Sequence, residues 1–177
     1  MLYLLDASAI LNEPNFEFEE GHKYITTPEV INEFKSLEVK HLIENALHHG
    51  FLKIQSTASE FERKIAQLVK EKGFSKLSKP DCSILALALE FKELNKKEFT
   101  VLTDDYSIQN FLLMLEIPFS PIIQEKIKQV MEFELCCPAC EKHYPPGSGK
   151  RKCDHCGTQL RKKPFFTKTV GKNVKTS

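Results

Sequence analysis

The sequence of 177 residues lacks any long hydrophobic run. A helix that crosses a bilayer needs about 20 predominantly apolar residues, and no stretch here approaches that length. The amino-terminal segment MLYLLDASAIL also lacks the basic flank of a secretory signal peptide, and it carries Asp6 within its apolar run. We therefore expect no membrane partner, a cytoplasmic location and a first β-strand at the amino terminus.

Internal repeats and low-complexity tracts are absent as well. A content of 41% hydrophobic and 28% charged residues is typical of a soluble globular protein. The chain is long enough for one domain of ordinary size with a sizeable core and for a small appendage.

The net charge of only +1 conceals an uneven distribution. Residues 136–177 contain 10 Lys and Arg against 2 acidic residues, a net charge of +8, whereas residues 1–135 carry a net charge of −7. A basic region on an acidic body indicates a polyanionic partner that is bound at one end of the molecule. The alternative is that the basic region is only a solubilising tail.

Strand and helix patterns alternate through the first 120 residues, which predicts an α/β domain with a largely parallel sheet flanked by helices. Ser78 and Asp81 have the spacing of a capping box, and Thr27 before Pro28 marks another helix start. Residues 124–135 are expected to form a helix or a strand-like linker. The expected strands are 2–6, 23–26, 51–56, 99–102 and 119–123, and the expected helices are 28–37, a helix ending near 49, 59–73, 79–94 and 106–117.

Five acidic residues lie where predicted strands end or predicted helices begin. In a parallel α/β sheet, ligands bind at the edge formed by the carboxyl ends of the strands. If the first strand and the 99–102 strand are neighbours, these carboxylates converge on one pocket, and the cluster needs a counter-charge such as Mg²⁺ or Mn²⁺. Alternatively, some of them are only capping residues or parts of a solvated helix face. The five are Asp6, Glu33, Asp81, Asp104 and Asp105.

Two C-x-x-C pairs, CPAC and CDHC, lie twelve residues apart near the carboxy terminus. This spacing predicts a tetrahedral zinc site with four thiolate ligands and no open position, hence a structural site. Cys136 could compete with its neighbour, but only Cys137 has the two-residue spacer. The predicted ligands are Cys137, Cys140, Cys153 and Cys156.

Basic residues flank the second cysteine pair, and the aromatic residues Phe165 and Phe166 follow them. Basic side chains beside exposed aromatic rings are typical of a platform for single-stranded nucleic acid. The alternative is that the two rings cover the small core of the zinc module. The candidate nucleic-acid contacts are Lys150, Arg151, Lys152, Arg161, Lys162 and Lys163.

The ordered segments LLDASAI, TTPEVINEF, LSKPDCSILALAL and VLTDDYSIQN resemble those of PIN domains, a family of metal-dependent ribonucleases. The resemblance covers about 120 residues and implies that the acidic residues surround the catalytic metals. The family pattern Thr-x-Asp falls on Thr103 and Asp105, which makes Asp104 a secondary residue. The implied ligands of Mg²⁺ or Mn²⁺ are Asp6, Asp81 and Asp105, with Glu33 and Asp104 beside them.

A PIN domain followed by a zinc ribbon is similar to the ribosome-assembly endonucleases that mature the 3′ end of small-subunit ribosomal RNA. This resemblance implies two-metal hydrolysis of a phosphodiester, with precursor rRNA and the pre-ribosomal particle as partners and no small-molecule substrate. Ser8 and Thr103 are candidates to orient a water or a phosphate, or are ordinary turn residues. The rival functions are a non-catalytic zinc-ribbon RNA-binding assembly factor and a phosphate-accepting receiver-like domain.

These features divide the chain into four parts. We expect a PIN nuclease domain over residues 1–120, a linker over 121–135, a zinc ribbon over 136–160 and a basic tail over 161–177.

Overall fold

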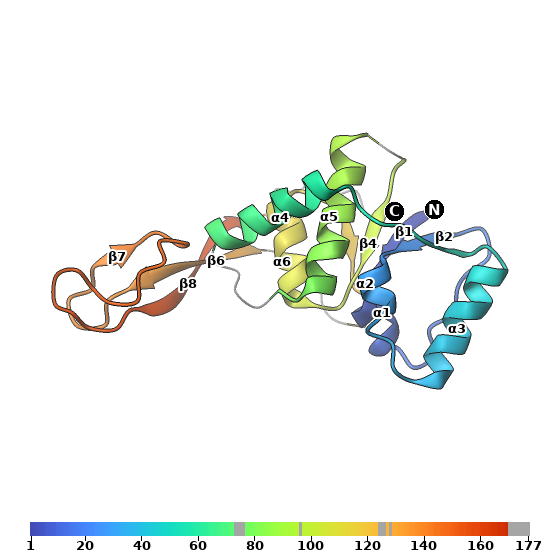
Figure 1. Cartoon of the computed structure of the whole chain (residues 1–177), viewed down its shortest axis with the longest axis horizontal. Helices are drawn as coiled ribbons and strands as arrows, with labels where there is room; N and C mark the ends of the chain where they lie inside the picture. The colour runs from blue at the N-terminus through green and yellow to red at the C-terminus, as the bar shows by residue number, and fades with distance from the viewer. Residues whose placement is uncertain (73–76, 96, 124–126, 128, 170–177) are drawn as a thin grey trace.

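A computed structural model describes residues 1–72, 77–95, 97–123, 127 and 129–169 of the chain (Figure 1). Parts of the expected linker, residues 124–126 and 128, and of the expected basic tail, residues 170–177, lie outside the described residues. The side chain of Phe166, named above as half of an aromatic pair, lies outside them too.

The described part of residues 1–120 forms a five-stranded parallel sheet flanked by helices, as predicted. The strand order is β3-β2-β1-β4-β5, so β1 lies at the centre and pairs with both β2 and β4. The strands are β1 (Leu2–Leu5), β2 (Lys23–Thr26), β3 (Leu52–Ile54), β4 (Thr100–Leu102) and β5 (Phe119–Ser120). The helices are α1 (Ala7–Leu11), α2 (Pro28–Ile31), α3 (Leu37–His48), α4 (Ser59–Glu71), α5 (Lys79–Glu93) and α6 (Tyr106–Met114).

Helix α5 is the core helix of this domain. Its residues from Ser83 to Phe91 are all buried, which is expected of a helix that is covered on every side. It packs against β1, α2, α4 and α6, and the predicted capping box of Ser78 and Asp81 begins it. The position of α5 therefore places Asp81 beside the carboxyl edge of the sheet.

The helix predicted over residues 28–37 is shorter in the structure. Thr27 caps α2 and Pro28 is its first residue, as expected, but α2 ends at Ile31. Asn32 then closes the turn, and Ser36 caps α3 by accepting a hydrogen bond from Val39 N. Short polar side chains favour caps over helix interiors, so Ser36 begins a new helix within the range that was expected to be helical.

A second, antiparallel sheet has the order β7-β6-β8 and extends from one end of the domain (Figure 1). Its strands are β6 (Gln129–Cys136), β7 (His143–Tyr144) and β8 (Arg161–Thr169). Two of the expected boundaries, 135/136 and 160/161, thus meet at a single ladder in which Cys136 pairs with Arg161. The described part of the expected linker and the described part of the expected tail are therefore partner strands. The backbone N–H and C=O groups of a strand need hydrogen-bond partners on another strand, and the sequence does not show which strand that is.

The second sheet is attached to the parallel-sheet domain through β6. Asn110 of α6 donates to Met131 O and accepts from Met131 N, both at 2.7 Å. Val130 is buried, and Lys72 forms an ion pair with Glu132 at 3.3 Å. No helix in the described part of the chain is both long and apolar enough to cross a membrane.

Candidate active site and metal centre

All five predicted acidic residues line one cleft of about 550 Å³. The parallel pairing of β1 with β4 brings Asp6, which follows β1, next to Asp104 and Asp105, which follow β4. Asp81 enters from the first turn of α5, and Glu33 lies two residues beyond the end of α2. The structure therefore brings together the whole predicted acidic set, which is Asp6, Glu33, Asp81, Asp104 and Asp105.

Asp6 is 2% exposed and is held by a network of hydroxyl groups. Its Oδ2 accepts hydrogen bonds from Ser8 Oγ at 2.6 Å and from Thr103 Oγ1 at 2.9 Å. Asp6 also caps α1 by accepting from Ser8 N, so it has a structural duty in addition to its place in the cleft. Ser8 and Thr103 orient a carboxylate and neighbouring backbone amides, since Ser8 Oγ also accepts from Asp104 N and Thr103 Oγ1 from Asp105 N.

The adjacent residues Asp104 and Asp105 bind different backbone segments. Asp104 is buried, and its Oδ1 accepts from the amides of Ile122 and Ile123 at 3.0 and 3.1 Å. Asp105 caps α6, and its Oδ1 accepts from Ser107 N at 2.6 Å and from Ile108 N at 3.2 Å. Hydrogen bonds from amides stabilise a carboxylate, which explains how two adjacent aspartates are tolerated.

A hydroxyl contact joins the elements that carry the other two acids. Thr27, at the start of α2, lies with its Oγ1 2.6 Å from Ser83 Oγ of α5. Asp81 is itself tied to the helix start, because its Oδ2 accepts from Ser78 N at 2.7 Å. The loop that carries Glu33 and the helix that carries Asp81 are thereby held together at the cleft.

The negative charges of the carboxylates in the cleft repel one another. Burial raises the pKa of Asp6, and the charge of Asp81 raises it further. Burial also raises the pKa of Glu33, with added contributions from Asp81 and Asp6. No Lys, Arg or His among the described residues lines this cleft. A cluster of hard oxygen donors without a protein cation fits a divalent cation such as Mg²⁺ or Mn²⁺.

The sequence reasoning did not single out five further lining residues, which are Ala7, Leu11, Asn12, Tyr106 and Ser107. Leu11 and Asn12 end α1 one turn after Ser8, and Tyr106 directly follows the paired aspartates. Their closeness in the sequence to the predicted acids was the signal that could have identified them as lining residues.

The second predicted centre is also assembled. The Sγ atoms of the four cysteines all lie within 4.8 Å of one another, and the shortest separations are 3.4 Å between Cys137 and Cys156 and 3.5 Å between Cys140 and Cys153. Cys136 is not part of this set. Four thiols in two C-x-x-C turns fit a closed, structural zinc ribbon. The described members are Cys137, Cys140, Cys153 and Cys156.

Backbone geometry and one tyrosine support this centre. Glu141 N donates to Cys137 O and Gly157 N donates to Cys153 O, both at 2.9 Å, so the two turns have the same form. Gly157 has a φ of 74°, as expected for the glycine that reverses the chain. Tyr144, which the sequence reasoning missed, donates from its hydroxyl to Cys153 Sγ at 3.2 Å and accepts from Asp154 N at 3.0 Å.

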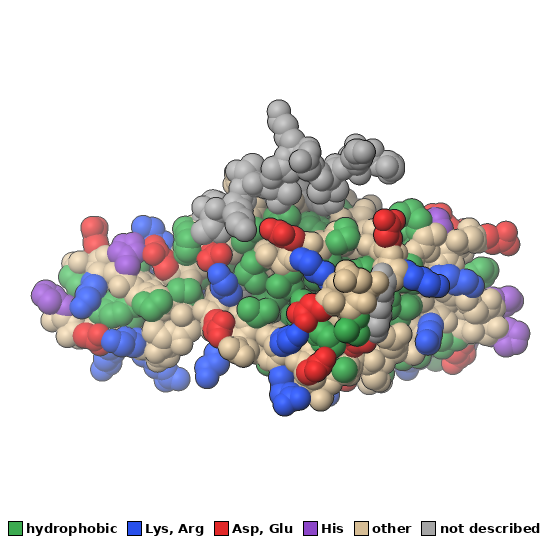
Figure 2. Space-filling model, turned by 90° about the horizontal axis from the view of Figure 1, so that it is seen from above, with side chains coloured by type: hydrophobic (Ala, Val, Ile, Leu, Met, Phe, Trp, Pro, Cys, Tyr) green, Lys and Arg blue, Asp and Glu red, His purple; other side chains and the backbone are tan. Residues whose placement is uncertain are grey.

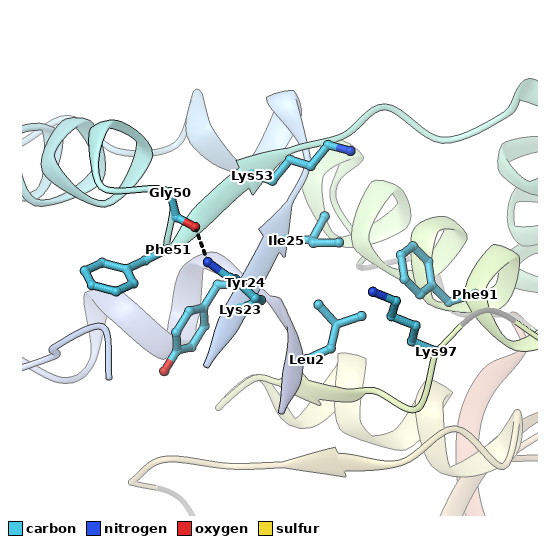
Figure 3. Close-up of a pocket in the computed structure, with 9 residues that line it drawn as sticks. All are labelled: Leu2, Lys23, Tyr24, Ile25, Gly50, Phe51, Lys53, Phe91 and Lys97. Atoms are coloured by element: carbon cyan, nitrogen blue, oxygen red, sulfur yellow. Dashed lines mark hydrogen bonds between the residues drawn. The ribbon is translucent and has the colours of Figure 1, made fainter. Parts of the chain in front are cut away.

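A second pocket, of about 530 Å³, lies near the opposite, amino ends of β1 and β2 (Figure 3). Its floor is apolar and includes Leu2, Ile25 and Phe91. Three lysines line it, and Lys23 donates to Gly50 O at 2.9 Å. None of its described lining residues is a carboxylate, so this pocket lacks the oxygen donors that the acidic cleft contains.

Comparison with known proteins agrees with this geometry. Residues 3–91 match the family described as the PIN domain of ribonuclease. Endoribonuclease Nob1 of Methanocaldococcus jannaschii is 38% identical over 97% of this chain and 82% of its own length. Endoribonuclease Nob1 of Methanothermobacter thermautotrophicus is 31% identical over 92% of this chain and 93% of its own length, and that of Pyrococcus abyssi is 30% identical over 77% and 81%. The chain belongs to the Nob1 family of PIN-domain endoribonucleases.

Proposed function

We propose that this endoribonuclease uses Mg²⁺ or Mn²⁺ to hydrolyse precursor small-subunit rRNA near its 3′ end, in a pre-ribosomal particle in the cytoplasm. The observation that carries the proposal is the single cleft with five acidic side chains and no described cationic one. The rRNA substrate is proposed from the likeness to ribosome-assembly endonucleases and from the basic zinc ribbon. The rival receiver-like domain has no use for Glu33 or for the ribbon.

In this proposal, Asp6, Asp81 and Asp105 hold the metal, and Glu33 and Asp104 contribute charge beside them. A bound Mg²⁺ or Mn²⁺ would lower the pKa of an attacking water and would neutralise negative charge on the scissile phosphate and on the leaving oxygen. The chain supplies rigid positioning. Helix caps and hydroxyl contacts hold the aspartates, so the carboxylates lose little freedom when a cation is bound.

The zinc ribbon is proposed to bind the RNA. Lys152 pairs with Gln159 in a β-bridge, and Leu160 N donates to Arg151 O at 2.9 Å. These contacts bring the basic segments 150–152 and 161–163 close together in the ribbon. The side chains are exposed, and Lys150 lies 5.3 Å from the ring centre of Tyr144. The proposed phosphate contacts are Lys150, Arg151, Lys152, Arg161, Lys162 and Lys163.

The surface charge is mixed on the face that Figure 2 shows. On the face in Figure 2, basic and acidic side chains are interspersed along the length of the molecule. RNA phosphates are therefore attracted only where lysines and arginines outnumber acids. The proposed division of labour places hydrolysis in residues 1–120, the zinc ribbon in 136–160 and further basic residues in 161–177.

The test is cleavage of a precursor small-subunit rRNA fragment with Mn²⁺ or Mg²⁺, followed by mapping of the new ends. We expect one cut near the mature 3′ end, leaving a 5′ phosphate and a 3′ hydroxyl. Asp6→Asn should abolish the cut while RNA affinity stays nearly unchanged, because this charge faces the metal rather than the ribbon. Cleavage at the wild-type rate by Asp6→Asn would refute the metal assignment. Tight binding of the RNA without any cleavage by the wild type would favour a non-catalytic assembly factor.

A further inference from the structure

Among the Phe and Tyr side chains that the structure describes, one is exposed, and it lies in the acidic cleft. The sequence contains 13 Phe and 4 Tyr. Of these Phe and Tyr residues, only Tyr106 is exposed in the part of the chain that the structure describes, with 51% of its surface accessible. It lines the same cleft as the five acids. A ligand in the cleft can therefore reach the exposed part of this ring, and aromatic rings offer a large apolar contact surface.

The start of α6 explains why this ring is exposed. Asp105 caps the helix, and Tyr106 is its first residue. The residues that face the core, Ile108, Phe111 and Leu112, follow in the next turns and are fully buried. Leu11, the last residue of α1, also lines the cleft and is 51% exposed. The cleft thus combines carboxylates with apolar side chains from two helices.

We infer that the Tyr106 ring stacks on a nucleobase next to the scissile phosphate and positions the RNA strand in the cleft. The inference rests on the proposed function. It adds a stacking contact with a base, which the carboxylates of the cleft cannot make. No described Lys or Arg lines the cleft, so ionic contacts with phosphates are supplied elsewhere. Stacking needs no charge and accepts every base, because each base has a flat π-face.

This role has a consequence for the substrate. A base reaches the ring only after it leaves the stack of its own strand, which is easily done in single-stranded RNA and costly in a duplex. The nucleotide beside the cut is therefore unpaired. Tyr106 acts as a positioning residue, and the hydrolytic chemistry stays with the carboxylates.

The kinetic test compares Tyr106→Phe, Tyr106→Leu and Tyr106→Ala on a single-stranded fragment that spans the cut. Loss of a base-stacking ring lowers affinity about tenfold or more, so we expect kcat/KM to fall about tenfold in the Leu and Ala variants. Tyr106→Phe keeps the ring and should retain nearly full activity. Equal losses in Phe and Ala variants would assign the role to the hydroxyl and overturn the inference.

An abasic substrate separates stacking from a structural role. Wild-type protein should lose about the same tenfold factor on RNA that lacks the base beside the cut. Tyr106→Ala should cleave the intact and abasic RNA equally well, since the ring and base act as one pair. Wild-type protein that cleaves both RNAs at the same rate would overturn the inference, while the endoribonuclease proposal would stand.

A binding measurement gives an answer that does not depend on cleavage. The fluorescent base 2-aminopurine is placed in turn at each position around the cut. We expect wild type and Tyr106→Phe to quench its fluorescence at one position, and Tyr106→Leu to leave the fluorescence at that position unchanged. Leu94→Ala is the matched control, because Leu94 is 55% exposed at the other end of the 15-residue helix α5, about 20 Å from the cleft. Equal quenching by wild type and Tyr106→Leu at every position would refute the stacking contact.

Discussion

Thr103 donates a hydrogen bond from Oγ1 to Asp6 Oδ2 at 2.9 Å, across 97 positions of sequence. The same Oγ1 accepts from Asp105 N at 3.1 Å. One buried hydroxyl group therefore links the carboxylate at the end of β1 to the backbone at the end of β4.

Replacing Thr103 with Val should disturb this link without changing the side-chain volume. The bond to Thr103 lowers the pKa of Asp6, so its loss should raise that pKa further. Buried polar groups left without a partner cost about 1–3 kcal/mol each, and urea denaturation should report a loss in that range. Thr103→Ser keeps the hydroxyl and is the control. A Val variant as stable as wild type, with an unchanged Asp6 titration by NMR, would contradict this reading.

The paired aspartates should separate into a structural and a catalytic member. Asp104→Ala should lower the unfolding free energy by about 1–3 kcal/mol, because the Ile122 and Ile123 amides lose their acceptor. Asp105→Asn should keep the cap of α6, since Asn caps helices as well as Asp does, yet lose cleavage. Asp104→Asn should impair cleavage less than Asp105→Asn, and the reverse order in a cleavage assay would exchange the two roles.

Glu33 should make the stability depend on pH. Burial and the neighbouring aspartates raise its pKa in the folded protein, so ionised Glu33 destabilises the fold. That penalty is full above the folded-state pKa, decreases as pH falls through it, and vanishes below the ordinary Glu pKa of about 4.3.

Without added Mg²⁺ or Mn²⁺, Glu33→Gln should therefore melt at a higher temperature than wild type at pH 7. The difference should disappear below about pH 4. Added Mn²⁺ should raise the Tm of wild type more than that of the variant. A variant that melts lower than wild type at pH 7 would show that Glu33 stabilises the metal-free fold.

Gly147 should anchor the zinc ribbon on α4. It has a φ of 74°, and a Cβ at this position would lie 2.7 Å from Lys70 O and 3.1 Å from Glu71 O. Gly149 has a similar φ of 68° with nothing within 4 Å of its Cβ position. Both Ala variants pay for the backbone conformation, but only Gly147→Ala meets a clash, which adds about 1–3 kcal/mol. Equal unfolding free energies for the two variants would show that this contact contributes nothing.

Cys153→Ser should lose zinc and unfold the ribbon while the parallel-sheet domain stays folded. The buried cluster of Cys137, Tyr144 and Cys153 is separate from the main core, and so small a module depends on its metal for folding. Metal analysis should find about one zinc per wild-type chain and almost none in the variant, with an unchanged helical circular dichroism signal. Full zinc retention would mean that Cys136 or a histidine completes the site, and a global collapse would mean that the two cores fold as one.

The sequence by itself determined the features that depend on neighbouring residues. The capping box of Ser78 and Asp81, the start of α2 at Thr27 and the two C-x-x-C turns are set by side chains within a few positions of the backbone they bind. The alternation of strands and helices indicated a parallel sheet, and with it the edge at which the acids meet.

Only the tertiary structure decided which distant segments are partners. The place of β1 between β2 and β4, the hydroxyl link from Thr103 to Asp6 and the ladder between β6 and β8 each join positions far apart in the chain. The exposure of Tyr106 is of the same kind, because its ring is left in the cleft by what the other elements cover. Local propensity carries no information on such pairings, since hydrogen bonds and burial are satisfied by whichever segment the whole fold brings near.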